Sequence, residues 1–135
     1  MNEQLLSTLE TSKNYTLAVA QAMPGGKYKF KPVETVWNFG ELLEHIAYGI
    51  RWWESNFVRS VKTDWAPPVA ATEKEIIIQN LTKAYDELEK TMGKGSLSKD
   101  AVKGFHATLD HITHHRGQAV IYLRCNGVEP PEYTY

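Results

Sequence analysis

The sequence predicts an all-α protein folded as a four-helix bundle, and three observations support this. Four long segments carry apolar residues at spacings of three and four, which is the pattern of an amphipathic helix. No segment shows sustained alternation of apolar and polar residues, so little or no sheet is expected. Glycine and proline separate the four segments. A chain of 135 residues builds one proper core, so residues 1–135 are expected to form a single domain.

The first helix is predicted from Asn2 to Ala22. It ends before Pro24-Gly-Gly26, which is expected to supply a break and residues with positive φ. A loop follows from Lys27 to Thr35, and the second helix is predicted from Asn38 to Phe57. The broad apolar face of the second helix consists of Phe39, Leu42, Leu43, Ile46, Ile50, Trp53 and Phe57.

The connection from Arg59 to Ala71 is near the upper end of ordinary loop lengths. It is long enough to cross the end of a bundle, so the third helix need not lie antiparallel beside the second. Thr72 and Glu75 have the spacing of a capping box and are predicted to open the third helix. Gly93-Lys-Gly-Ser96 ends it. Its predicted apolar stripe is Ile78, Leu81, Tyr85, Leu88 and Met92.

Ser98 is the predicted N-cap of the fourth helix, which is expected to end near Asn126-Gly127. Arg116 falls within the apolar arc of this helix. A buried guanidinium needs a carboxylate or carbonyl partner, so an internal ion pair or a contact with a second subunit is expected there. The predicted packing residues are Phe105, Leu109, Ile112, Ala119, Val120 and Leu123.

Two histidines of the fourth helix, His111 and His115, are the most informative pair in the chain. Residues four apart lie one above the other on a helix, so both imidazoles can bind one metal ion. In the metalloprotease pattern His-Glu-x-x-His, a glutamate that acts as general base follows the first histidine. Here Ile112 follows His111, so peptide hydrolysis by that route is not expected.

The third ligand is predicted to be His45, because it lies at the edge of the apolar face of the second helix. His106 and His114 point away from the stripe of the pair and are interpreted as solvent-facing. Three nitrogen ligands leave coordination positions open, which is typical of a catalytic metal. Alone, however, a histidine pair at this spacing also occurs without metal.

Further residues are candidates for a pocket or for orienting the ligands. Gly49 leaves room for a ligand one turn from His45, and Glu41 is the better candidate for orienting it. Trp52 either lines the pocket or belongs to the core. For a general base, Glu41 and His114 are weak candidates. The remaining candidates, on the stripe of the histidine pair, are Thr108, Gln118 and Tyr122.

Composition excludes several classes of protein. The formal net charge of −1 gives no overall attraction to nucleic acid or anionic membranes. One cysteine, Cys125, excludes an intramolecular disulfide framework and fits a reducing compartment. The N-terminus lacks the apolar run of a signal peptide, and no stretch has the length of a membrane span. A soluble cytoplasmic protein is expected.

The segment His111-Ile-Thr-His-His-Arg-Gly-Gln118, with Tyr122-Leu-Arg124 and Pro130-Pro131, closely resembles the C-terminal signature of the DinB-like superfamily. Phe39-Gly-Glu-Leu-Leu-Glu-His45 resembles the family's entry into its second helix, and the resemblance extends from about Leu5 to Pro131. It implies an up-down-down-up bundle with a long connection between the second and third helices. It also implies a Zn²⁺ or Ni²⁺ site at the three histidines and frequently a homodimer.

The expected function is that of a metal-dependent enzyme, either a thiol-dependent S-transferase or a hydrolase, acting on a small molecule. Some members of the family it resembles use low-molecular-weight thiols, and a bound divalent ion lowers the pKa of a thiol or water. The alternative is a non-catalytic, stress-response homodimer in which the metal only stabilises the bundle. A homodimer is also expected because apolar residues extend beyond the core stripes, as Tyr15 and Leu17 do on the first helix. The first helix and part of the fourth are the favoured interface.

Overall fold

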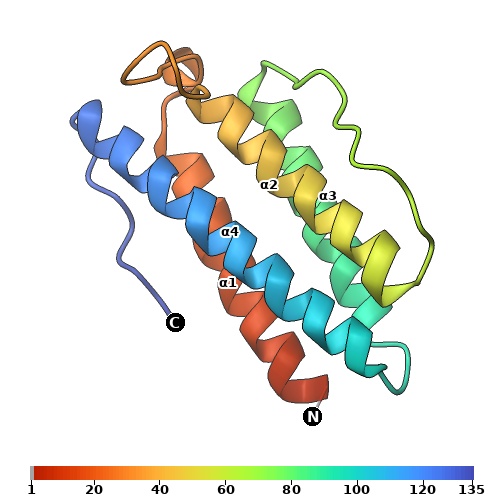
Figure 1. The fold of residues 1–135 in the computed structure, drawn as a ribbon. Helices are drawn as coiled ribbons and strands as arrows, with labels where there is room; N and C mark the ends of the chain where they lie inside the picture. Colours follow the sequence, from red (N-terminus) through yellow and green to blue (C-terminus); the bar gives the residue numbers. More distant parts are fainter. Residues whose placement is uncertain (1) are drawn as a thin grey trace.

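The computed structural model describes residues 2–135, which form helices and connections with no strand. Figure 1 shows four long helices packed side by side. None of the helices in the described part of the chain has the length and apolar character needed to cross a membrane. The elements are α1 (Asn2–Ala22), η1 (Gly25–Lys27), α2 (Phe39–Trp53), η2 (Glu54–Val58), α3 (Lys74–Met92) and α4 (Lys99–Cys125).

Helices α2 and α1 each pack against both α3 and α4, and the apolar stripes meet in one core. The faces predicted for α2 and α4 are largely confirmed, since Phe39, Ile46 and Ile112 are completely buried. In α3 the buried residue of the first turn is Ile77 rather than the predicted Ile78, which is partly exposed.

Side-chain contacts fix the relative directions of the helices. Asn80 of α3 donates to Glu44 near the middle of α2 (3.0 Å), and Thr91 donates to Glu54 just after α2 (3.0 Å). Later residues of α3 therefore contact later residues of the α2 segment, so the two neighbouring helices are parallel. The connection at residues 59–73 returns along the length of the bundle to make this possible (Figure 1).

The helix starts differ from the predicted ones in one respect. Ser98 caps α4 as expected, accepting from the backbone N–H of Ala101 (3.0 Å). The capping box predicted from Thr72 is wrong, because α3 begins at Lys74 and its N-cap, Glu73, makes no side-chain cap. A complete capping box instead opens α2, where Asn38 and Glu41 exchange hydrogen bonds.

The turn after α1 also differs from expectation. Gly25 and Gly26 form the short helix η1 and do not have positive φ, so the break comes from Pro24 and the 3₁₀ turn. At the end of α4, Gly127 has φ of 69°, as the helix stop predicted there requires.

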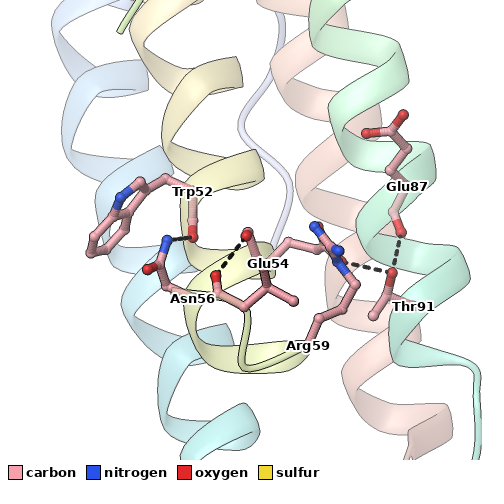
Figure 2. A network of polar contacts seen from close by, with 8 residues as sticks. Trp52, Glu54, Asn56, Arg59, Glu87 and Thr91 are labelled. Carbon is pink, nitrogen blue, oxygen red and sulfur yellow. Dashed lines mark hydrogen bonds and ion pairs between the residues drawn. The ribbon is translucent and has the colours of Figure 1, made fainter. Parts of the chain in front are cut away.

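The predicted second helix ends in a single π-helical turn, η2. Figure 2 shows the polar contacts that hold this turn. Asn56 donates to the carbonyl of Trp52 (2.8 Å), while Glu54 accepts from Arg59 and from Thr91 of α3. The turn that follows α2 is thereby bonded to α3.

Beyond α4 the chain turns back beside the bundle (Figure 1). Its position is set by aromatic contacts, because the Tyr133 ring lies edge-on to Tyr15 of α1 at 5.3 Å between centroids. Tyr15 was expected to be exposed and to contribute apolar surface to a dimer interface. In the single chain its side chain is only 6% exposed.

Candidate metal centre

The side chains of His45, His111 and His115 converge between α2 and α4. One nitrogen from each ring can be chosen such that all three atoms lie within 4.8 Å of one another. The closest approach joins Nε2 of His45 and Nε2 of His111, at 2.8 Å. The structure thus brings together the three histidines that the sequence predicted. His106 and His114 are exposed, also as predicted.

Helix geometry explains how two elements supply three rings. His111 and His115 stand one turn apart on α4, and their ring centroids are 4.6 Å apart. The two helices pack closely because Gly49 of α2 has no side chain. A Cβ at that position would lie 2.6 Å from Cε1 and 2.7 Å from Nδ1 of His111. The room that Gly49 was expected to leave for a ligand is filled by His111 itself.

Gln118, a pocket candidate on the same stripe, is hydrogen-bonded to His115. Nδ1 of His115 and Oε1 of Gln118 are 2.9 Å apart. An amide oxygen only accepts, so this bond places the ring proton on Nδ1. Nε2 of His115 is then left with its lone pair available toward the other two histidines.

The environment favours neutral imidazoles. Burial, together with the nearby His115, lowers the pKa of His45 to about 4. Burial and the neighbouring histidines also lower the pKa of His111 to about 4, and burial lowers the pKa of His115. All three rings are therefore neutral near pH 7, which is the form that binds metal ions.

This donor set fits a divalent transition metal. Neutral imidazoles suit Zn²⁺ and Ni²⁺, and zinc binds such nitrogens at about 2.0–2.1 Å. Metal-binding histidines usually donate their second N–H to an acceptor, as His115 does toward Gln118. Nδ1 of His111 differs, since it is buried against Gly49 with no hydrogen-bond partner in the described part of the chain.

Three tryptophans surround the histidines, and the sequence interpretation missed two of them. Trp37, just before α2, lies 4.4 Å from the His45 ring, and Trp65, in the long connection, lies 5.6 Å from it. Both are in connections, where helical periodicity gives no signal. Trp53, expected in the core, lies 5.0 Å from the His111 ring. Trp52 instead packs on Trp53 and donates to the carbonyl of Thr63.

Two pockets flank the histidines, and Trp37 lines both. The larger, of about 400 Å³, is mainly apolar and reaches His115. The smaller, of about 180 Å³, reaches His45 and carries Glu41. Residues of the larger pocket are Pro32, Thr35, Val36, Trp37, Leu42, His115, Gln118, Ile121 and Tyr122.

The other predicted candidates have the following places. Tyr122 lines the larger pocket, and its hydroxyl donates to the carbonyl of Trp37 (2.7 Å), which anchors that residue over the site. The carboxylate of Glu41 accepts the backbone N–H of Asn38 and so serves the helix cap. Thr108 is buried and donates to the carbonyl of Gly104, one turn earlier on α4, rather than to the histidines.

Comparison with known proteins agrees with the helical fold. The family model of the DinB superfamily matches residues 8–124. A DinB-like protein from Bacillus cereus ATCC 10987 superposes with a TM-score of 0.84 at 16% identity, covering 98% of this chain and 97% of that one. The DinB-like protein YjoA from Bacillus subtilis gives 0.78 at 18% identity, covering 97% and 98%. No curated protein matches. Because the family model spans most of the sequence, the chain belongs to the DinB superfamily.

Proposed function

We propose that this protein is a metal-dependent enzyme that acts on a small molecule at His45, His111 and His115. The observation that carries the proposal is the convergence of three neutral imidazoles between two pockets. A divalent ion held there, Zn²⁺ or Ni²⁺, would lower the pKa of a bound water or thiol. Thiol-dependent S-transfer and hydrolysis are the two reaction classes that this chemistry serves.

The surrounding side chains have distinct tasks in this proposal. Gln118 holds the His115 ring in one tautomer. Trp37 and Trp65 shield the imidazoles from bulk water, because each packs on His45 from a different connection. The apolar pocket beside His115 would take the body of the substrate, with Leu42 in its wall. Substrate specificity therefore depends on this pocket more than on charge.

The assembly and location are part of the same proposal. We infer an up-down-down-up order from the shared direction of α2 and α3.

We also infer a cytoplasmic homodimer that uses a low-molecular-weight thiol as a partner. The reason for the dimer is weaker than the sequence suggested, since Tyr15 is covered within the chain. Sedimentation at micromolar concentration tests it, and a monomer of about 15.4 kDa contradicts it.

Activity is tested on protein purified without a histidine tag and loaded with Zn²⁺ or Ni²⁺. The assays follow thiol addition to 1-chloro-2,4-dinitrobenzene and hydrolysis of p-nitrophenyl acetate. The proposal expects turnover that His115→Ala abolishes and that His106→Ala, a change at an exposed histidine outside the cluster, retains. The alternative is a metal that only stabilises the fold. It is favoured if adding the metal raises the melting temperature but neither variant changes the rate of either reaction.

A further inference from the structure

A second site lies on a different side of α4 from the histidines. A pocket of about 570 Å³ opens between α1, α4 and the chain that follows α4. Arg116, Val120 and Arg124 line it from α4, Tyr15 from α1, and Tyr133 from the returning chain. None of its lining residues lines either pocket beside the histidines.

Arg116 is the unusual residue of this pocket, because it is a cation that is only 5% exposed. Its Nη1 donates to the hydroxyl of Thr16 (3.1 Å), which also accepts from the hydroxyl of Tyr85 (2.9 Å). Its guanidinium lies over the rings of Tyr15 and Tyr133, at 4.8 and 5.9 Å. The partners of the guanidinium are one hydroxyl and two aromatic rings, and none carries a negative charge.

The ion pair expected for Arg116 from the sequence is therefore absent among residues 2–135. Burying a charge without a counter-charge is costly, so a carboxylate partner is the missing element. A guanidinium has five N–H donors in a fixed fork, and the hydroxyl of Thr16 uses one side of it. Arg116 lines the pocket, and its one hydrogen bond within residues 2–135 goes to Thr16, so the remaining N–H groups have no protein acceptor there.

We propose that this pocket binds a small organic carboxylate. The carboxylate would pair with the free side of the Arg116 fork, and the apolar body would lie against Tyr15, Val120 and Pro131. The acidic residues Glu129 and Glu132 also line the pocket, so a singly charged anion is favoured over phosphate. The site does not depend on a metal, and its occupation is independent of the proposed activity.

The first experiment uses the unaltered chain and follows amide chemical shifts while benzoate is added. Benzamide, which has the same shape without the charge, and inorganic phosphate are the two comparison probes. Benzoate is expected to give saturable shifts that include Gly117 and Tyr133, which line the pocket. The proposal is overturned if benzoate does not bind. It is also overturned if benzamide or phosphate binds as tightly as benzoate.

The second experiment compares two arginines of the same pocket. Arg116→Lys keeps the positive charge but lacks the planar fork, and is expected to weaken benzoate binding about tenfold. Arg124→Gln removes an exposed charge from the pocket rim and is expected to change binding by less than about twofold. Equal losses in the two variants, or an unchanged affinity in Arg116→Lys, also overturn the proposal. Should Arg116→Lys not fold, the comparison of the three probes on the unaltered chain decides.

Discussion

Gly49 of α2 lies directly against the imidazole of His111 on α4. The space that a side chain would occupy at position 49 already holds Cε1 and Nδ1 of that ring, which would come within 2.6 and 2.7 Å of a Cβ. The contact is between a helix backbone and the ring of a candidate ligand. A single methyl group at this position must therefore move His111.

Gly49→Ala is expected to lower metal affinity at least tenfold while the helical fold is kept. An imidazole is the free end of a side chain, so it rotates away before the helices separate, and the ligand nitrogens no longer converge. Gly117→Ala is the matched control on α4, because a Cβ there meets nothing within 4 Å. Competition with a fluorescent zinc chelator measures the zinc affinity of both variants. Unchanged affinity in Gly49→Ala would mean that His111 does not bind the metal.

His111→Ala is expected to reduce bound metal from one ion per chain to a small fraction of that value. His106→Ala, which changes an exposed histidine five residues earlier on the same helix, is expected to leave the metal content unchanged. Elemental analysis after dialysis against trace Zn²⁺ gives both numbers. Equal metal content in the two variants would contradict the assignment of His111 as a ligand.

Metal affinity is expected to be nearly constant from pH 8 to about 6.5, to decline below that pH as His115 takes up protons, and to fall most steeply toward pH 4. Ordinary histidines would lose the metal near pH 6.5. Here the pKa values of His45 and His111 are lowered to about 4, so protons compete for these two rings only under more acidic conditions. Zinc titration by calorimetry across this range measures the effect. If the loss of metal affinity had its midpoint near pH 6.5, the imidazole rings would be more exposed to solvent than they are in the structure.

The same pKa values give the metal-free protein a second pH dependence. As pH falls below 6.5, the unfolded chain takes up protons on these histidines before the folded chain does. The free energy of unfolding therefore declines from about pH 6.5 to about 4. Urea unfolding of the metal-free protein measures this decline, which should be smaller in His45→Ala than in His106→Ala.

Gln118→Ala is expected to weaken metal binding by about 10- to 100-fold, the usual range for losing the partner that orients a ligand. Without the amide oxygen, the His115 ring is free to change tautomer and to turn. Gln79→Ala, at an exposed glutamine on α3, is the control for losing such a side chain. Binding that is equally tight in both variants would leave Gln118 without a role at the site.

The histidine cluster could be predicted from the sequence because the pattern that indicates it lies within single helices. A spacing of four places His111 and His115 on one face, and the apolar face of α2 places His45 toward the core. The helices were predicted for the same reason, from a period that each segment carries within itself. Helix ends were harder to predict: Thr72 has a side chain able to cap, yet α3 begins at Lys74 with Glu73 as its N-cap and no side-chain cap.

Contacts between connections and helices were not predictable in this way. Trp37 and Trp65 reach His45 from segments without periodicity, and their positions depend on how those segments fold back. The aromatic partners of Arg116 include Tyr133, which approaches only because the chain turns beside α1. Gly49 was expected to leave room for a ligand, but in the packed structure the ring of His111 fills that space.

The chain contains four tryptophans, and all of them belong to the aromatic cluster around the histidines. Trp37, Trp53 and Trp65 each contact a histidine ring, and Trp52 packs against Trp53. Ultraviolet emission from this protein therefore originates almost entirely from the surroundings of the three histidines between α2 and α4. The molecule carries an intrinsic optical reporter, so events at the three imidazoles can be followed in real time without attaching a dye.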